Sequence, residues 1–200
     1  MRDVPTLPEM KRAALFTVVG VGYFALWLRM IEPGFQIPDA PSDWLGVLTF
    51  SALLIAQALA LPTFARLIGV ETVFRVSLVP AIGAALGGVT NVLEDGLHQD
   101  WAFYGFVAGS VITMLGLAAL ALMLGFTGRG RRRLLAAIPA ALFAGQLLFP
   151  VVGGILVLPA WLAAAAVASG RPARASTQTS RSCPRRYLVF AMILVMSALS

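Results

Sequence analysis

Residues 134–169 read LLAAIPAALFAGQLLFPVVGGILVLPAWLAAAAVAS, without one charged side chain. A membrane-spanning helix needs about 20 apolar residues to cross about 30 Å of hydrocarbon. As a single helix this stretch would be about 54 Å long, because a helix rises about 1.5 Å per residue. Pro150 and the pair Gly153-Gly154 lie near its middle and can form a turn. The stretch therefore predicts two short helices in a tight hairpin, 134–149 and 152–168, with a re-entrant hairpin as the alternative.

Four further apolar runs precede this stretch and have the length of membrane spans. They cover residues 13–31, 44–65, 72–93 and 101–124. Lipid offers no hydrogen-bond partner to the backbone, so each run should be an α-helix. The first run follows Lys11 and Arg12 as in a secretion signal, but it lacks a small-x-small cleavage pattern and indicates an uncleaved anchor. The predicted fold is an all-α transmembrane bundle of six spans.

The composition agrees with this fold class. The chain has 200 residues, of which 59% are hydrophobic and 12% charged, whereas soluble domains carry about 25% charged residues. Arginine supplies all but one of the basic residues, and alanine and glycine are abundant, which is typical of a high-GC bacterial genome. The lone Cys183 excludes an intramolecular disulfide, a four-cysteine zinc site and a CxxC redox pair.

The distribution of basic residues predicts the orientation of the spans. Cytoplasmic loops of membrane proteins are enriched in Lys and Arg. If the six spans alternate, every basic residue except Arg29 falls on one side, and Glu32, Asp39, Asp43, Glu94, Asp95 and Asp100 fall on the other. We therefore expect a multi-pass protein of the bacterial inner (plasma) membrane, with its N-terminus and C-terminal linker in the cytoplasm. Five spans would instead place the last five arginines outside.

The end of the chain differs from the predicted bundle of residues 1–169. Residues 170–186 are rich in Ser, Thr, Pro and Arg, which predicts a disordered, basic, cytoplasmic linker. Residues 187–200 are apolar again, but 14 residues are short for a span. This tail could lie in the membrane interface, pack against the bundle or cross as a strained seventh helix; a peripheral helix is the favoured interpretation.

The densest polar cluster follows the third predicted span. Asn91, Glu94, Asp95 and His98 could bind a ligand there, because carboxylates and an imidazole can ligate a divalent metal or pass a proton. For Glu94 and His98 to share one helical face, the helix must continue to His98, and Gly96 is expected to end it earlier. An acidic outer loop that sets topology is the competing interpretation. We assign no catalytic or metal-binding residue.

Two glutamines lie inside predicted spans. Gln57 and Gln146 should each hydrogen-bond to a neighbouring helix, a contribution of about 1 kcal/mol. Both lie in Ala/Leu-rich segments that end in proline, and the two spans should run in opposite directions, which would suit an inverted-repeat transporter. The next in-span proline follows Gln57 by 23 residues but Gln146 by only 13, which counts against such a repeat.

Small residues at four-residue spacing predict close helix packing. The motifs are Gly83-x-x-x-Gly87, Ala84-x-x-x-Gly88 and Gly105-x-x-x-Gly109. They could join helices within one chain, or could form a homo-oligomer or an interface with a partner membrane protein. The other partner expected from the sequence is membrane lipid, and no nucleic acid is expected.

The sequence favours a non-enzymatic role. It contains no Gly-x-Ser-x-Gly elbow, HExxH helix or Walker loop, and its single histidine cannot provide bis-histidine haem ligation. We expect no cofactor. The favoured interpretation is a scaffold, accessory or envelope component, and the alternative is a small ion or solute transporter or channel. An intramembrane enzyme is the third hypothesis, with His98 and Glu94 as the only candidate groups.

Overall fold

A computed structural model describes residues 7–31 and 44–169, and every regular element within these ranges is a helix. The long helices are α1 (Leu7–Met30), α2 (Trp44–Ile68), α3 (Glu71–Asn91), α4 (Ala102–Thr127) and α7 (Gly154–Ser169). The shorter ones are α5 (Arg131–Leu134), α6 (Ala137–Leu147) and two π-helical turns, η2 (Val92–Gly96) and η3 (Phe149–Gly153). The predicted all-α bundle is confirmed, whereas the predicted linker and tail lie outside the described residues.

The described chain contains five helices of spanning length, against six predicted spans. They are Pro8–Met30, Trp44–Ile68, Glu71–Gly96, Ala102–Thr127 and Phe149–Ser169. The remaining predicted span, 134–149, forms only the 11-residue α6, which is about 16 Å long. Pro139 and Pro150 explain its length, because proline lacks the N–H that a continuous helix would need and is tolerated in the first turn. Accordingly, α6 begins two residues before Pro139, and η3 begins one residue before Pro150.

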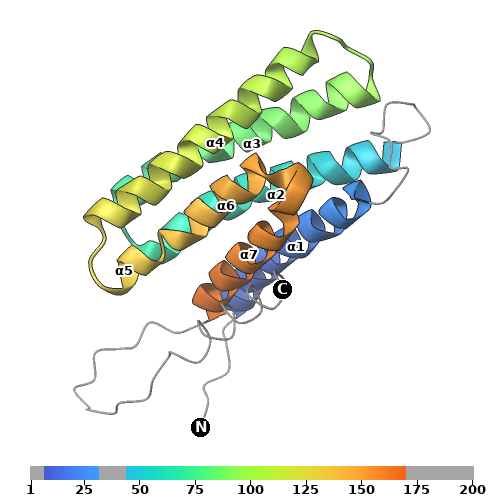
Figure 1. The fold of residues 1–200 in the computed structure, drawn as a ribbon. Helices are drawn as coiled ribbons and strands as arrows, with labels where there is room; N and C mark the ends of the chain where they lie inside the picture. Colours follow the sequence, from blue (N-terminus) through green and yellow to red (C-terminus); the bar gives the residue numbers. More distant parts are fainter. Residues whose placement is uncertain (1–6, 32–43, 170–200) are drawn as a thin grey trace. The chain divides into compact units, whose positions relative to one another are not determined.

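Each long helix packs along neighbours that follow one another around the bundle. The order is α1, α2, α3, α4, α6 and α7, and α7 returns to pack along α1 (Figure 1). The first and last helices therefore close the bundle. Phe16 of α1 stacks on Trp161 of α7 at a ring-centroid distance of 5.7 Å, and both side chains are fully buried.

Successive long helices run in opposite directions, so the bundle has two chemically distinct ends (Figure 1). At the end that we call the basic end, α1 begins, α2 joins α3, α4 joins α5, and α7 ends. Its basic residues are Lys11, Arg12, Arg66, Arg75, Arg129, Arg132 and Arg133. At the opposite, acidic end lie Arg29, Glu94, Asp95 and Asp100. The structure thus gathers the loop charges as the sequence pattern predicted, without itself saying which end faces the cytoplasm.

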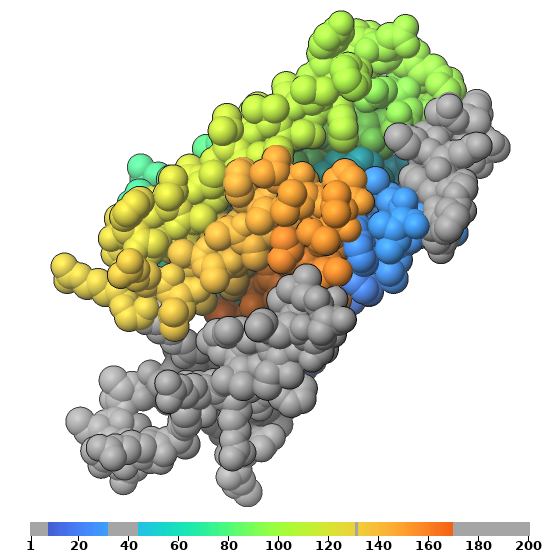
Figure 2. Space-filling model, in the orientation of Figure 1, coloured from blue at the N-terminus to red at the C-terminus, as the bar shows by residue number. Residues whose placement is uncertain are grey.

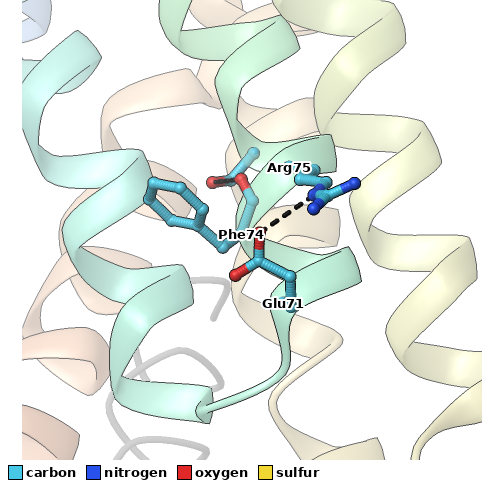
Figure 3. A network of polar contacts seen from close by, with 4 residues as sticks. Glu71, Phe74 and Arg75 are labelled. Atoms are coloured by element: carbon cyan, nitrogen blue, oxygen red, sulfur yellow. Dashed lines mark hydrogen bonds and ion pairs between the residues drawn. The ribbon is translucent and has the colours of Figure 1, made fainter.

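The junction of α2 and α3 is organised by residues at the basic end. Arg75 Nε donates to Glu71 Oε1 at 2.9 Å, one turn earlier on α3, and the Arg66 guanidinium lies 4.8 Å from the centroid of the Phe74 ring (Figure 3). The Arg75–Glu71 side chains are 75% and 69% exposed, so the pair contributes no more than about 0.5 kcal/mol. The junction is therefore held mainly by packing.

Glycines let α3 and α4 approach each other closely. A Cβ at Gly109 would lie 2.6 Å from the backbone N of Gly87 and 2.7 Å from the carbonyl O of Gly83. Gly88, on another face of α3, lies against the Ser51 carbonyl of α2. The glycine motifs predicted from the sequence therefore form helix contacts within this chain.

The outward faces of the long helices are apolar. Large side chains such as Leu45, Leu115 and Phe126 are 81%, 65% and 84% exposed. A water-soluble bundle would cover such faces with charged residues, whereas lipid solvates them. Spanning length and apolar outer faces together are those of a multi-pass integral membrane protein.

Candidate functional site

The hairpin formed by α6, η3 and α7 ends inside the bundle rather than at its acidic end. Gln146, near the end of α6, hydrogen-bonds to Gln57 of α2. Gln57 lies 13 residues after Trp44, where α2 begins, which is about 20 Å along the helix. Figure 1 shows the turn stopping short of the acidic ends of α2, α3 and α4. The hairpin therefore has the re-entrant form that the sequence left as an alternative.

Glycine and aromatic residues seat the hairpin tip against α1 and against itself. A Cβ at Gly154 would lie 2.6 Å from Cβ of Trp27, and one at Gly145 would lie 3.1 Å from the carbonyl O of Gly153. The Phe149 ring meets the Tyr23 ring edge-on at 6.1 Å. Since the tip contains the π-helical turn η3, it is also irregular backbone of a kind often found at functional sites.

The two glutamines predicted inside spans are partners of each other. Gln146 Nε2 donates to Gln57 Oε1 at 3.0 Å. Gln57 is fully buried, and its own Nε2 has no hydrogen-bond partner within the described chain. The bond joins the tip of the hairpin to the middle of α2. The two helices run in opposite directions, but α2 has 25 residues and α6 only 11, so they are unequal copies if they are a repeat.

A cavity of about 160 Å³ lies between the hairpin tip and helices α1 to α4. In Figure 2 a hollow separates α4 from the tip of the hairpin, and α2 is visible between them. The apolar lining comes from Phe50, Leu54, Gly83, Ala84, Gly87, Phe106, Met114 and Phe149, and the polar lining from Tyr23, Ser110, Thr113 and Gln146. None of these residues is ionised at neutral pH, so the cavity suits an uncharged occupant.

The Tyr23 hydroxyl is the most informative polar group of the cavity wall. Tyr23 is 3% exposed, and its hydroxyl has no hydrogen-bond partner among the described residues. By contrast, the Thr113 hydroxyl is satisfied, because it donates to the Gly109 carbonyl at 2.8 Å. Buried polar groups in native proteins are nearly always paired with protein, water or ligand. The Tyr23 hydroxyl therefore offers an occupant of the cavity one unused hydrogen-bonding group.

Asn91, a candidate from the sequence, is a buried packing residue between α3 and α2. It is 3% exposed, and its Nδ2 donates to Ser51 Oγ at 3.0 Å and to the Val47 carbonyl at 3.5 Å. These bonds use its amide donors within the chain. Asn91 therefore joins the outer halves of two helices and does not face the cavity.

The remaining residues of the predicted polar cluster do not converge on one point. Glu94 and Asp95 lie half-buried in η2, which ends at Gly96 as the glycine predicted. His98 follows in a turn, exposed, with a φ of 53° in the left-handed region. The helical spacing that would have placed Glu94 and His98 on one face is therefore absent. No group of three metal-ligating side chains occurs within residues 7–31 and 44–169.

The cavity residues other than Gln146 were not singled out by the sequence. Phe50, Phe106 and Phe149 looked like ordinary packing or lipid-facing residues, because aromatic side chains are common in apolar helices. The two glutamines were the available signal, since polar groups at membrane depth are costly and point to an interior site. Only the pairing of helices distant in sequence brings the three phenylalanines to one cavity.

No protein-family model matches this chain, and no curated protein or solved structure matches it either. Its function must therefore be argued from the residues of the bundle themselves.

Proposed function

We propose that this membrane protein is a non-enzymatic binding protein that holds one small, uncharged molecule in the cavity above the hairpin tip. The observation that carries the proposal is the buried, unpartnered Tyr23 hydroxyl in the wall of an otherwise uncharged cavity. An enclosed apolar space with a few polar groups is the usual form of a small-molecule site. In this role the protein would act as an accessory, scaffold or envelope component whose state reports on its ligand.

The non-enzymatic part of the proposal is supported by the chemistry of the cavity wall. Its polar groups are hydroxyls and one amide, with no carboxylate or imidazole beside them in the described chain. Nucleophilic catalysis by a hydroxyl needs a base within hydrogen-bond reach. His98, the only histidine, is exposed at the acidic end.

For orientation, we place the basic end in the cytoplasm of a bacterial cell, in the inner membrane. The support is the clustering of lysine and arginine at one end, which follows the bias of cytoplasmic loops. The same arginines would contact anionic lipid headgroups. The orientation does not depend on whether the hairpin crosses fully or turns back, because α6 enters and α7 leaves at the same end. The N-terminus and the linker after Ser169 would then both be cytoplasmic.

The test is a binding measurement on the full chain in lipid nanodiscs, with a cavity-filling variant. A Cβ at Gly87 would lie 3.7 Å from Leu54 Cδ1 and 3.9 Å from Phe106 Cδ2, which is ordinary contact. Gly87→Leu should therefore fold and fill the cavity. Gly125→Leu is the matched control, because a Cβ at Gly125 meets nothing within 4 Å.

Xenon and a panel of small neutral compounds would be followed by ligand-detected NMR. Wild type and Gly125→Leu should bind xenon and at least one compound, and Gly87→Leu should bind none. The proposal is rejected if Gly87→Leu binds everything that the wild type binds.

A second candidate function, passage of a small neutral solute, is favoured by the position of the hairpin tip. A half-depth hairpin with a glutamine pair at its end divides the bundle into a cavity and a closed half, and interrupted helices line the sites of some transporters. Proteoliposome flux that is lost in Gly87→Leu but kept in Gly125→Leu would favour this candidate. Binding without flux across a broad solute panel would leave the binding role alone.

A further inference from the structure

The size of the cavity limits its occupant to about one six-membered ring. A dry, apolar protein cavity of about 150 Å³ accommodates one benzene molecule, and this cavity measures about 160 Å³. Sites for drug-sized ligands are about 300–1,000 Å³. Sugars, nucleotides and whole lipids are therefore too large to be enclosed.

The walls of the cavity favour a flat aromatic ring. Phe50 and Phe106 meet at 6.1 Å with an interplanar angle of 62°, and Phe149 lies edge-on to Tyr23. Gly83, Ala84 and Gly87 give the α3 side of the cavity a surface almost without side chains. Aromatic rings pack well in such edge-to-face arrangements, and the flat α3 surface leaves room for the face of a ring.

The polar groups of the wall select one hydrogen-bonding substituent and no charge. The Tyr23 hydroxyl, buried without a partner, can both donate and accept. The Gln146 side chain also lines the cavity. A ligand carboxylate or ammonium would be desolvated with no counter-charge beside it, which is costly. A hydroxyl on the ligand would instead satisfy the Tyr23 hydroxyl.

We infer that the cavity binds a neutral single-ring phenol, with the ring among Phe50, Phe106 and Phe149 and its hydroxyl bonded to that of Tyr23. The inference rests on the proposed binding function and names its ligand class. The hollow beside α4 and the apolar outer surface of the bundle (Figure 2) suit a compound that partitions into lipid before it enters.

The experiment compares phenol with toluene and benzoate on the full chain in nanodiscs. Toluene has the same shape as phenol but lacks the hydroxyl, and benzoate carries a charge. We expect the wild type to bind phenol about tenfold more tightly than toluene, the effect of one good hydrogen bond, and not to bind benzoate. Tyr23→Phe removes only an unpartnered hydroxyl, so it should fold normally, lower phenol affinity to that of toluene and leave toluene affinity unchanged.

The variants separate failure of this inference from failure of the proposed function. Gly87→Leu should lose both phenol and toluene, whereas Gly125→Leu should keep both. Equal affinity for phenol and toluene, or a phenol affinity that Tyr23→Phe does not change, would overturn the phenol assignment while the binding function stands. A different neutral ligand that Gly87→Leu loses would do the same. If no compound, xenon included, distinguishes Gly87→Leu from the wild type, both proposals fall together.

Discussion

Gln146 Nε2 donates a hydrogen bond to Gln57 Oε1 at 3.0 Å, across 89 residues of sequence. The bond fixes the depth to which the hairpin enters the bundle, because it fastens the last turn of α6 to the middle of α2. It also forms part of the floor of the cavity, since Gln146 lines it and Gln57 lies directly behind. One polar pair therefore couples the packing of the bundle to the shape of its candidate site.

Removal of either glutamine should destabilise the protein, but by different amounts. Gln146→Leu leaves the fully buried Gln57 amide without any partner, at a cost of about 1–3 kcal/mol. Gln57→Leu leaves only the half-buried Gln146, which can turn to the cavity, so its cost should be smaller, about 1 kcal/mol. Chemical unfolding in detergent micelles would measure both.

The double variant, Gln57→Leu with Gln146→Leu, completes the cycle for this pair. Because neither side leaves an unpartnered amide, its loss of stability should be less than the sum of the two single losses. Strict additivity of the three free energies of unfolding would mean that the two side chains do not interact.

The close approach of α3 and α4 predicts that Gly109 cannot accept a side chain. In Gly109→Ala the new Cβ would press on backbone atoms of Gly87 and Gly83, which cannot turn aside. The helices must separate, at a cost of about 1–3 kcal/mol. Thermal unfolding followed by circular dichroism would detect the loss. Gly125→Ala, on the same helix and in open space, should melt at the wild-type temperature or slightly above; equal melting of the two variants would contradict this packing.

Apolar run lengths and arginine placement were enough to predict the fold class and the grouping of charges. The hairpin was less predictable, because residues 134–169 fit two short spans and a re-entrant turn equally well by composition. What decides between them is a contact, the bond from Gln146 to Gln57, and no local pattern reveals such a partner. The sequence selected both glutamines as interior polar groups but could not pair them.

The candidate site was predicted less well than the fold. Asn91 and Glu94 drew attention because they are polar residues near a span end, and Asn91 is explained by its bonds to α2. Tyr23 drew none, since a tyrosine in an apolar helix is ordinary. Its importance comes from a hydroxyl left without a partner, which depends on how five separate helical segments pack around it.

Asn91→Ala tests whether that residue is a packing group or a ligand-binding group. The substitution removes the bonds to Ser51 Oγ and the Val47 carbonyl, so we expect a loss of about 1–2 kcal/mol of stability. Gln99→Ala, an exposed change in the following turn, should leave stability unchanged. The measurement is thermal unfolding together with phenol affinity. Lost binding at unchanged stability would instead assign Asn91 to a ligand site.

Cysteine labelling in intact cells tests the depth of the hairpin. In a Cys183→Ser background, we would place single cysteines at Gln99, Val151 and Arg129, all of them exposed. With the basic end in the cytoplasm, a bulky maleimide that cannot cross membranes should label Gln99→Cys from outside. It should reach Arg129→Cys only after permeabilisation.

Val151→Cys, at the hairpin tip, separates the two forms of the hairpin. Because the tip stops short of the acidic ends of α2, α3 and α4, the bulky reagent should label it far more slowly than Gln99→Cys. A small methanethiosulfonate reagent can enter a narrow opening, so it should react faster than the maleimide if water reaches the tip. Equal maleimide rates at positions 151 and 99 would mean that α6 and α7 cross the whole membrane. The cavity would then lie beside two complete spans, and the bond between the glutamines could not be holding a half-depth hairpin.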